Sequence, residues 1–291
     1  MAPLSIRSTV KLNSGYELPL LGFGLYRTPP AETEDVVLKA FAAGYRHIDS
    51  AATYRNEAGA GAAVRNSGIP RSELFFTTKV PYKKTSYEGA KKQVADSLAL
   101  SGLDYIDLVL LHAPYGGSEA RKGAWHALVE AVEAGHVRSI GVSNYGVHHL
   151  DELLVHIKEL EEERGGPGKG GILSVGQWEI HPWVARRDIV DWSTKHNVAV
   201  QAYSPLVRGD RWGEAALTSL ADKYKVSEAQ VLIQWSLQKG HVPLPKSANP
   251  GRIKSNADVY GFELTADEVA ALETTEYEPV CWDPTVAPLD E

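Results

Sequence analysis

The sequence predicts an α/β fold in which eight parallel strands close into a (β/α)8 TIM barrel, and three observations support this prediction. Short apolar runs alternate with amphipathic stretches along the chain, with turn residues at each junction. Eight such runs are present, more than an open doubly wound sheet usually contains. A length of 291 residues is ordinary for a barrel with a single core. We therefore expect one domain over residues 1–291.

The apolar runs are the predicted strands and the amphipathic stretches are the predicted helices. The strands are expected at Leu21–Tyr26, Tyr45–Asp49, Leu74–Lys79, Ile106–His112, Ser139–Asn144, Ser174–Glu179, Val198–Tyr203 and His241–Lys246. The helices are expected at Thr33–Ala43, Asn56–Asn66, Tyr87–Leu100, Glu119–Ala134, Val147–Glu163, Ala185–His196 and Glu228–Gln238, where apolar residues recur at helical spacing.

Two additions flank the repeats. Val10–Leu12 and Tyr16–Leu18 enclose a short polar turn with a glycine, which predicts an N-terminal β-hairpin that closes one end of the barrel. Thr265–Glu276 predicts an extra C-terminal helix with Thr265 as its N-cap, followed by a tail. The glycine-rich stretch Arg164–Gly171 is interpreted as a flexible loop, because the alternation resumes unchanged after it.

Composition narrows the class of protein. The apolar share of 43% and the charged share of 23% are those of a globular protein. The net charge of -7, with scattered acids, argues against broad nucleic-acid binding. Cys281 is the only cysteine, and no run of the chain looks like a signal peptide or a membrane span. We expect a cytoplasmic protein without nucleic-acid or membrane partners, acting as a monomer or weak dimer.

Polar residues stand at the carboxyl ends of the predicted strands, which is where barrel enzymes carry their chemistry. Each one alone is ordinary, since a lone histidine is more often a hydrogen-bonded core residue than a functional one. Their convergence on one rim favours a site. The strand ends supply Asp49, Lys79, His112, Ser143, Asn144, Gln177, Tyr203, Ser204, Lys246 and Ser247.

Three of these residues, Asp49, Lys79 and His112, suggest proton transfer together with Tyr54. Tyr54 follows closely after Asp49, and a free tyrosine has a pKa near ~10, too high for easy proton exchange at neutral pH. The ammonium of Lys79 is expected to lower the pKa of Tyr54, while Asp49 keeps the lysine charged and in place. His112 is then placed to orient a substrate carbonyl.

Three runs resemble the aldo-keto reductases. The run from Gly44 to Glu57, with Gly61 following, is similar to the first signature of that family, and Leu103–Pro114 is similar to its second. Pro245–Asn256 resembles its cofactor-binding segment. The matches follow in order from the Gly22 region onward and cover nearly the whole chain.

The resemblance implies NADPH-dependent reduction of aldehydes or ketones on the rim of the barrel, with a small carbonyl compound as partner. It implies Tyr54 as general acid, tuned by Asp49 and Lys79, with His112 orienting the carbonyl. The implied cofactor residues are Ser143, Asn144, Gln177, Tyr203, Ser204, Leu206, Lys246, Ser247, Arg252 and Asn256. Tyr26, Pro81 and Ala113 are expected to line the substrate pocket, and Ser255 departs from an acid common in relatives.

The cofactor assignment also has a physical basis. Lys246 and Arg252 lie six residues apart, across a strand end and the first turn of a helix, where backbone donors favour a phosphate. That arrangement suits the 2′-phosphate of NADPH. Arg252 and Asn256 are one helical turn apart, so both are expected to face the adenine end.

Two other hypotheses remain open at the level of sequence. A metal-dependent barrel hydrolase would use His47, His112, His181 and Asp49, although it leaves Tyr54 and the basic segment unexplained. A catalytically silent NADP(H)-binding subunit or sensor would keep the fold without turnover. The complete set of four proton-transfer residues favours an enzyme over both, and no metal is expected.

Overall fold

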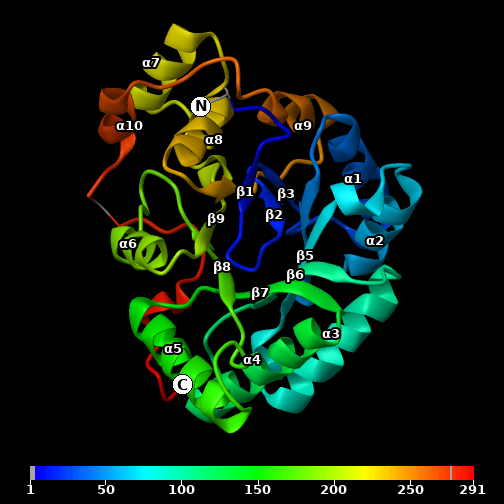
Figure 1. The fold of residues 1–291 in the computed structure, drawn as a ribbon. Helices are drawn as coiled ribbons and strands as arrows, with labels where there is room; N and C mark the ends of the chain where they lie inside the picture. Colours follow the sequence, from blue (N-terminus) through cyan, green and yellow to red (C-terminus); the bar gives the residue numbers. More distant parts are fainter. Residues whose placement is uncertain (1–3, 276) are drawn as a thin grey trace.

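The structure, a computed structural model, describes residues 4–275 and 277–291 and confirms the barrel. All eight strands are parallel and follow one another around the barrel in chain order (Figure 1). The amide of Gly24 donates to the carbonyl of Pro245 at 3.0 Å, which joins the two ends of the sheet. The strands are β3 (Gly22–Gly24), β4 (His47–Asp49), β5 (Phe75–Val80), β6 (Ile106–Leu111), β7 (Val137–Ser143), β8 (Leu173–Glu179), β9 (Ala199–Tyr203) and β10 (Val242–Pro243).

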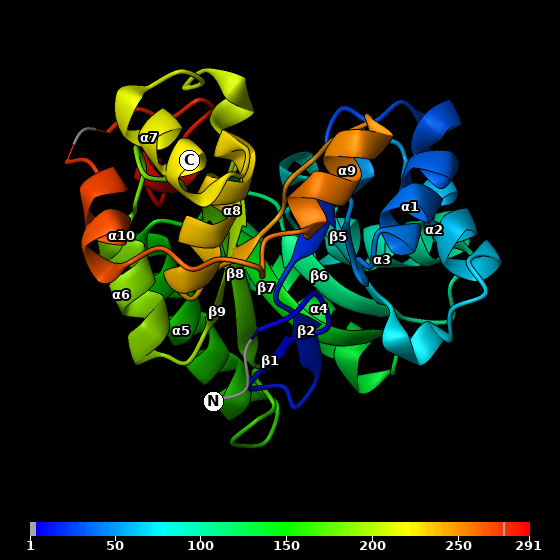
Figure 2. The same ribbon diagram turned by 90° about the horizontal axis from the view of Figure 1, so that it is seen from above.

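The predicted hairpin plugs the amino-terminal end of the barrel. It consists of β1 (Thr9–Lys11) and β2 (Glu17–Pro19), paired antiparallel. Figure 2 shows it at the opposite end of the barrel from the C-terminal tail. Side chains of the hairpin enter an apolar cluster inside the barrel, which contains Leu12, Leu18, Phe75, Leu108, Leu110, Val175 and Val242.

Helices cover the outside of the barrel, and a second apolar cluster fills the space between helices and sheet. The seven helices expected from sequence are all present, with ends shifted by at most two residues. They are α1 (Thr33–Ala42), α2 (Glu57–Asn66), α3 (Tyr87–Ser101), α4 (Ser118–Glu133), α5 (Val147–Glu163), α6 (Arg187–Lys195) and α8 (Glu228–Gln238).

Three further helices complete the described chain. α7 (Ala215–Tyr224) was not expected, because it shares the crossover after β9 with α8 and only three residues separate the two. α9 (Pro250–Ala257) is the helix expected after Lys246. α10 (Ala266–Leu272) begins at its predicted N-cap, where the Thr265 hydroxyl accepts from the amide of Glu268 at 3.2 Å. It ends earlier than predicted, and the predicted end at Glu276 lies outside the described residues.

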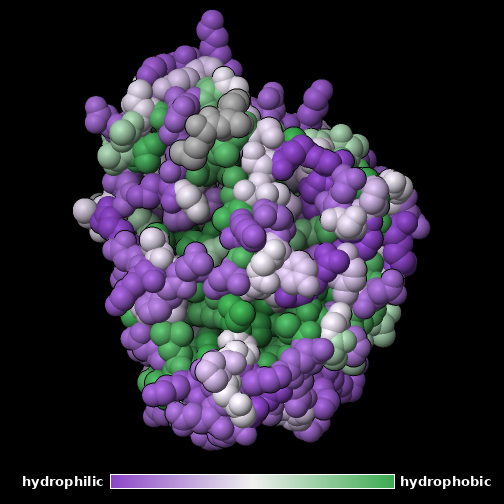
Figure 3. Space-filling model, in the orientation of Figure 1, coloured by the Kyte–Doolittle hydropathy of each residue, from purple (hydrophilic) through white to green (hydrophobic). Residues whose placement is uncertain are grey.

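The surface around the hairpin is mostly hydrophilic, with hydrophobic residues showing chiefly as a band below its centre (Figure 3). None of the helices in the described ranges is long and apolar enough to cross a membrane.

Candidate active site

The polar strand ends meet in one cavity of about 720 Å³ at the carboxyl end of the barrel. Asp49 ends β4, Tyr54 follows it in a short 3-10 turn (Ala52–Tyr54), and His112 follows β6; all three line the cavity. Lys79 lies deeper, with its side chain fully buried. The neighbouring ends of β4, β5 and β6, with the short turn after β4, therefore bring the four predicted proton-transfer residues together.

Lys79 and Asp49 form a buried ion pair. The ammonium nitrogen is 2.9 Å from Oδ1 and 2.7 Å from Oδ2 of Asp49, and it also donates to the carbonyl of Ser50 at 2.8 Å. A buried charge without a partner would be costly, so each residue depends on the other for its place in the interior. Burial lowers the pKa of Lys79, and the charge of Asp49 opposes this shift.

The environment of Tyr54 differs from the expectation in one respect. The Lys79 ammonium lies 5.1 Å from the centre of the Tyr54 ring, so the two are neighbours as predicted. Burial, followed by the negative charge of Asp49, nevertheless raises the pKa of Tyr54 well above 10. The expected lowering of this pKa is wrong for this arrangement, because burial of the phenol outweighs the nearby ammonium and the charge of Asp49 acts in the same direction as burial. The phenol is held in its protonated form, the form a general acid requires.

His112 stands beside Tyr54 in its neutral form. The two rings are 5.9 Å apart in an edge-on arrangement, and burial, with a smaller contribution from Lys79, lowers the pKa of His112 to about 3. The side-chain amide of Asn144 donates to the His112 carbonyl at 2.9 Å, which fixes the backbone. A neutral imidazole next to a protonated phenol presents two hydrogen-bond donors to one carbonyl oxygen.

One wall of the cavity carries the side chains expected to hold a nicotinamide. Asn144 has a left-handed backbone with φ of 62°, and its amide oxygen accepts from the Tyr203 hydroxyl at 2.7 Å. The Ser143 hydroxyl donates to the carbonyl of Gln177 at 2.9 Å. Gln177 donates to Asp49 from the same side-chain nitrogen that faces Gln201, each at 2.8 Å. The wall is thus held rigidly by its own hydrogen bonds.

The far end of the cavity is basic. Lys246 and Ser247, from the segment between β10 and α9, and Arg252 and Asn256, from α9, all line it. No carboxylate in the described part of the chain lies within salt-bridge distance of Lys246 or Arg252. Two uncompensated cations in a concave site suit a ligand that brings its own negative charge.

The remaining expected residues divide into two groups. Ser204, Leu206 and Tyr26 line the cavity, and the Tyr26 ring lies 5.2 Å from that of Tyr54. Ala113 is fully buried, and neither it nor Pro81 lines the cavity, contrary to the expectation. Ala113 follows His112 directly, and successive residues of an extended chain point to opposite faces, so it turns away from the cavity.

The C-terminal tail supplies a wall that sequence reasoning did not place. Trp282 lines the cavity and packs against Tyr82 and Tyr115, with ring centres 5.7 and 5.9 Å apart. Buried Glu179 anchors the tail, because its carboxylate accepts from the amides of Val280 and Cys281 at 2.7 and 3.1 Å. Glu179 continues the inward alternation of β8 two residues beyond Gln177, and that pattern is the signal that could have identified it.

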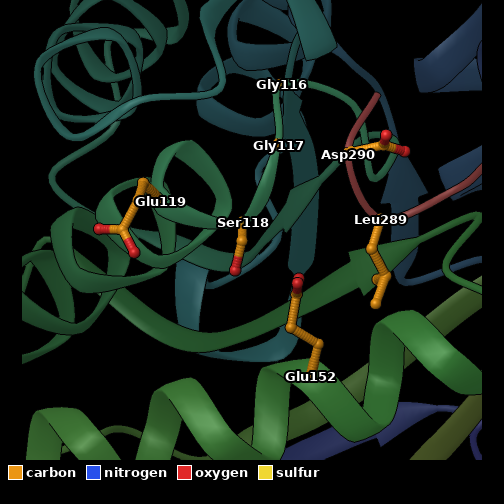
Figure 4. A pocket seen from close by; sticks show the side chains of 7 residues that line it. All are labelled: Gly116, Gly117, Ser118, Glu119, Glu152, Leu289 and Asp290. Carbon is orange, nitrogen blue, oxygen red and sulfur yellow. The ribbon is translucent and has the colours of Figure 1, made fainter.

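Further along, the tail passes a second hollow of about 460 Å³ (Figure 4). Ser118 at the start of α4, Glu152 of α5 and Leu289 of the tail lie around it. Behind it, buried Arg121 bonds Glu152 at 2.7 Å and the carbonyl of Leu289 at 2.6 Å. These contacts make this hollow a second point of attachment for the tail.

The ligands of the hypothetical metal hydrolase do not converge. His47 contacts Thr77 and Gln201 inside the barrel, whereas His181 contacts Glu179 at 2.9 Å. Within residues 4–275 and 277–291, no three His, Cys, Asp or Glu side chains form a group that could hold a metal ion. The geometry instead defines a barrel with a buried tyrosine and a neutral histidine beside a partly basic cavity.

Comparison with known proteins agrees with that class. A model of the aldo/keto reductase family matches residues 20–214 and 211–276. The chain is 41% identical to an aldo-keto reductase of Mycolicibacterium vanbaalenii, with 91% of each chain covered. It is 38% identical to a glyoxal reductase of Bacillus subtilis, covering 93% of this chain and 94% of the relative. The crystal structure of an aldo/keto reductase from Brucella melitensis, 37% identical, covers 91% of this chain and 98% of its own with a TM-score of 0.83.

The chain therefore belongs to the aldo/keto reductase family. Membership makes it an oxidoreductase of the carbonyl-reducing kind.

Proposed function

We propose that this protein reduces aldehydes or ketones to alcohols with NADPH, and that Tyr54 is the general acid. The observation that carries the proposal is the single cavity that joins Tyr54 and His112 to the basic end at Lys246 and Arg252. A reduced nicotinamide supplies a hydride to the carbonyl carbon. Ser143, Asn144 and Gln177 would hold its carboxamide, and Tyr203 would stack on the ring.

The residues of the chain supply the proton and the orientation. The carbonyl oxygen gains negative charge as its carbon is reduced, and the Tyr54 hydroxyl donates the proton that neutralises it. Neutral His112 hydrogen-bonds the same oxygen and sets the angle of approach. The aromatic side chains of Tyr26, Tyr82 and Trp282 exclude water around the substrate.

The glyoxal reductase among the relatives suggests small dicarbonyl compounds as the first substrates to examine. Purified protein would be assayed for NADPH oxidation against glyoxal, simple aldehydes, ketoesters and sugars. We expect turnover of at least one of these substrate classes. In Tyr54→Phe, NADPH should still bind tightly, while the rate of carbonyl reduction should fall by about a thousandfold, which is within the range for loss of a general acid. If the wild-type protein bound NADPH but reduced none of these substrates, a catalytically silent subunit would be favoured. If Tyr54→Phe reduced them as fast as the wild type, Tyr54 would not be the general acid.

A further inference from the structure

A chain of polar side chains runs down the interior of the barrel beneath the cavity. Asp49 and His47 point inward from β4, Gln177 from β8 and Gln201 from β9, in agreement with the alternation of each strand. Gln177 and Gln201 are paired in the sheet register. All four residues are buried, and His47 and Gln201 have no exposed surface.

In this series of side chains, the donor and the acceptor of each hydrogen bond can be assigned in only one way. Asp49 accepts two bonds from Lys79, so the Gln177 atom that lies 2.8 Å from Asp49 Oδ1 must be its NH2 group. The second hydrogen of that NH2 group points to Gln201, at 2.8 Å, and the atom that receives it must be the Gln201 oxygen.

The same argument applies at the lower end of the series, between Gln201 and His47. The NH2 group of Gln201 lies 3.5 Å from Nε2 of His47, so this nitrogen has to act as an acceptor. Burial and the charge of Lys79 lower the pKa of His47 to about 3, which leaves an unprotonated nitrogen available. The Thr77 hydroxyl lies 3.2 Å from the same nitrogen. The donor and acceptor roles that follow from Asp49 are therefore consistent through Gln177 and Gln201 to His47.

This assignment of donors and acceptors determines which side-chain atom of Gln177 faces the cavity. Both hydrogens of its NH2 group are taken by Asp49 and Gln201, and its amide oxygen has no hydrogen bond to any described residue. Gln177 lines the cavity, so the oxygen is its available polar atom. We propose that Gln201 is a positioning residue that locks the Gln177 amide, so that an acceptor and not a donor faces the nicotinamide carboxamide. This inference rests on the proposed use of NADPH.

The test compares ligands that differ at one group. The oxidised cofactor NADP⁺ has a carboxamide NH2 to donate to Gln177, its 3-acetylpyridine analogue has a methyl group there, and its thionicotinamide analogue keeps the NH2. Adenosine 2′,5′-bisphosphate contains only the adenine end. Affinities would be measured by equilibrium titration of the intrinsic tryptophan fluorescence, with no turnover involved.

Wild type should bind NADP⁺ and the thionicotinamide analogue about tenfold more tightly than the acetylpyridine analogue, as expected for one hydrogen bond. Gln201→Met, of similar volume, removes one of the two bonds that orient the Gln177 amide and should reduce this difference severalfold, while its affinity for the bisphosphate stays within about twofold. Gln201→Glu keeps an acceptor toward Gln177 and should retain the difference. Gln93→Met, which removes a buried glutamine of α3 that bonds Lys84 and Ser97, is the matched control.

Three outcomes would overturn the inference. They are equal affinity of wild type for NADP⁺ and the acetylpyridine analogue, an unchanged preference in Gln201→Met, or equal losses for NADP⁺ and the bisphosphate. The first requires no variant and so holds even if Gln201→Met does not fold. Failure of wild type to bind NADP⁺ and the bisphosphate at all would instead overturn the proposed function, which separates the two conclusions.

Discussion

The ammonium of Lys79 bonds to both carboxylate oxygens of Asp49 and to the carbonyl of Ser50, and it makes no hydrogen bond to the hydroxyl of Tyr54. Lys79 therefore influences the tyrosine only through its charge, at 5.1 Å from the ring, and Asp49 offsets that charge. The same carboxylate of Asp49 also accepts a hydrogen bond from the side-chain amide of Gln177 at 2.8 Å. The position of the lysine thus bears on the proposed cofactor wall as much as on the proposed proton donor.

The first prediction concerns the pH dependence of reduction. Burial and Asp49 raise the pKa of Tyr54 well above 10, so this proposed proton donor stays protonated through the neutral and mildly alkaline range. Burial lowers the pKa of His112 to about 3, so it stays neutral at the acid end. We expect kcat/KM for NADPH-dependent reduction to be constant from about pH 6 to 9.5. A transition near 6.5 that disappears in His112→Asn, or a decline below pH 9, would contradict these protonation states.

The second prediction concerns stability in acid. Burial lowers the pKa of His241 to about 4, whereas an unfolded histidine takes up its proton near ~6.5. The folded state is favoured while the ring is neutral, so this stabilisation is complete above pH 6.5 and is lost as the pH falls toward 4. Between pH 6.5 and 5, the free energy of unfolding of the wild type should fall more steeply with decreasing pH than that of His241→Phe. The difference between the two slopes should be about 1 kcal/mol per pH unit.

Urea denaturation at several pH values would measure this slope. His126, on the exposed side of α4, provides the matched control, and His126→Phe should leave the slope unchanged. Equal slopes for wild type and His241→Phe would show that the folded state accepts a proton at this site as easily as the unfolded chain does.

Sequence alone was enough to predict the barrel and the proximity of Asp49, Tyr54, Lys79 and His112, because both follow from local patterns. The alternation of strands such as β8 tells which residues point inward, and the carboxyl ends of parallel strands share one rim. The tail could not be placed in this way. Trp282 reaches the cavity through contacts with Tyr82 and Tyr115, which come from distant parts of the chain, and no periodicity connects these segments. The raised pKa of Tyr54 was missed for a similar reason, since it depends on three-dimensional burial and on the balance of two charges.

The third prediction concerns preference for the phosphorylated cofactor. Lys246 and Arg252 line the basic end of the cavity, and the guanidinium of Arg252 lies 3.4 Å from the hydroxyl of buried Ser247. Lys246→Met and Arg252→Leu should each lower the preference for NADPH over NADH by about 1.5 to 3 kcal/mol, because each removes a charge-assisted hydrogen bond.

The preference would be measured from equilibrium binding of both cofactors at fixed salt concentration. Lys254→Met alters an exposed lysine of the same helix that does not line the cavity, and should leave the ratio of affinities unchanged. An unaltered ratio in both Lys246→Met and Arg252→Leu would place the phosphate elsewhere.

The fourth prediction concerns the attachment of the tail. Glu179→Gln keeps the size of the side chain but replaces the charged acceptor of the Val280 and Cys281 amides with a neutral group. The segment of the tail at Val280 and Cys281 should therefore separate from β8 more often. Cys281, whose sulfur contacts Ser204 at 3.2 Å, is the only cysteine in the chain, so a thiol-specific reagent reports on this segment alone. We expect labelling to be about tenfold faster, because a charge-assisted hydrogen bond contributes about 1.5 kcal/mol or more to local closure.

The same variant should weaken substrate binding, since Trp282 follows Cys281 directly and forms part of the cavity wall. The KM for the carbonyl substrate should therefore rise while labelling accelerates. Glu273→Gln is the matched control, because Glu273 bonds Arg187 and Lys239 and has no contact with the cavity. A labelling rate in Glu179→Gln equal to that of wild type would mean that the other attachments, through Arg186 to Asp283 and through Arg121 to Leu289, hold the tail without Glu179.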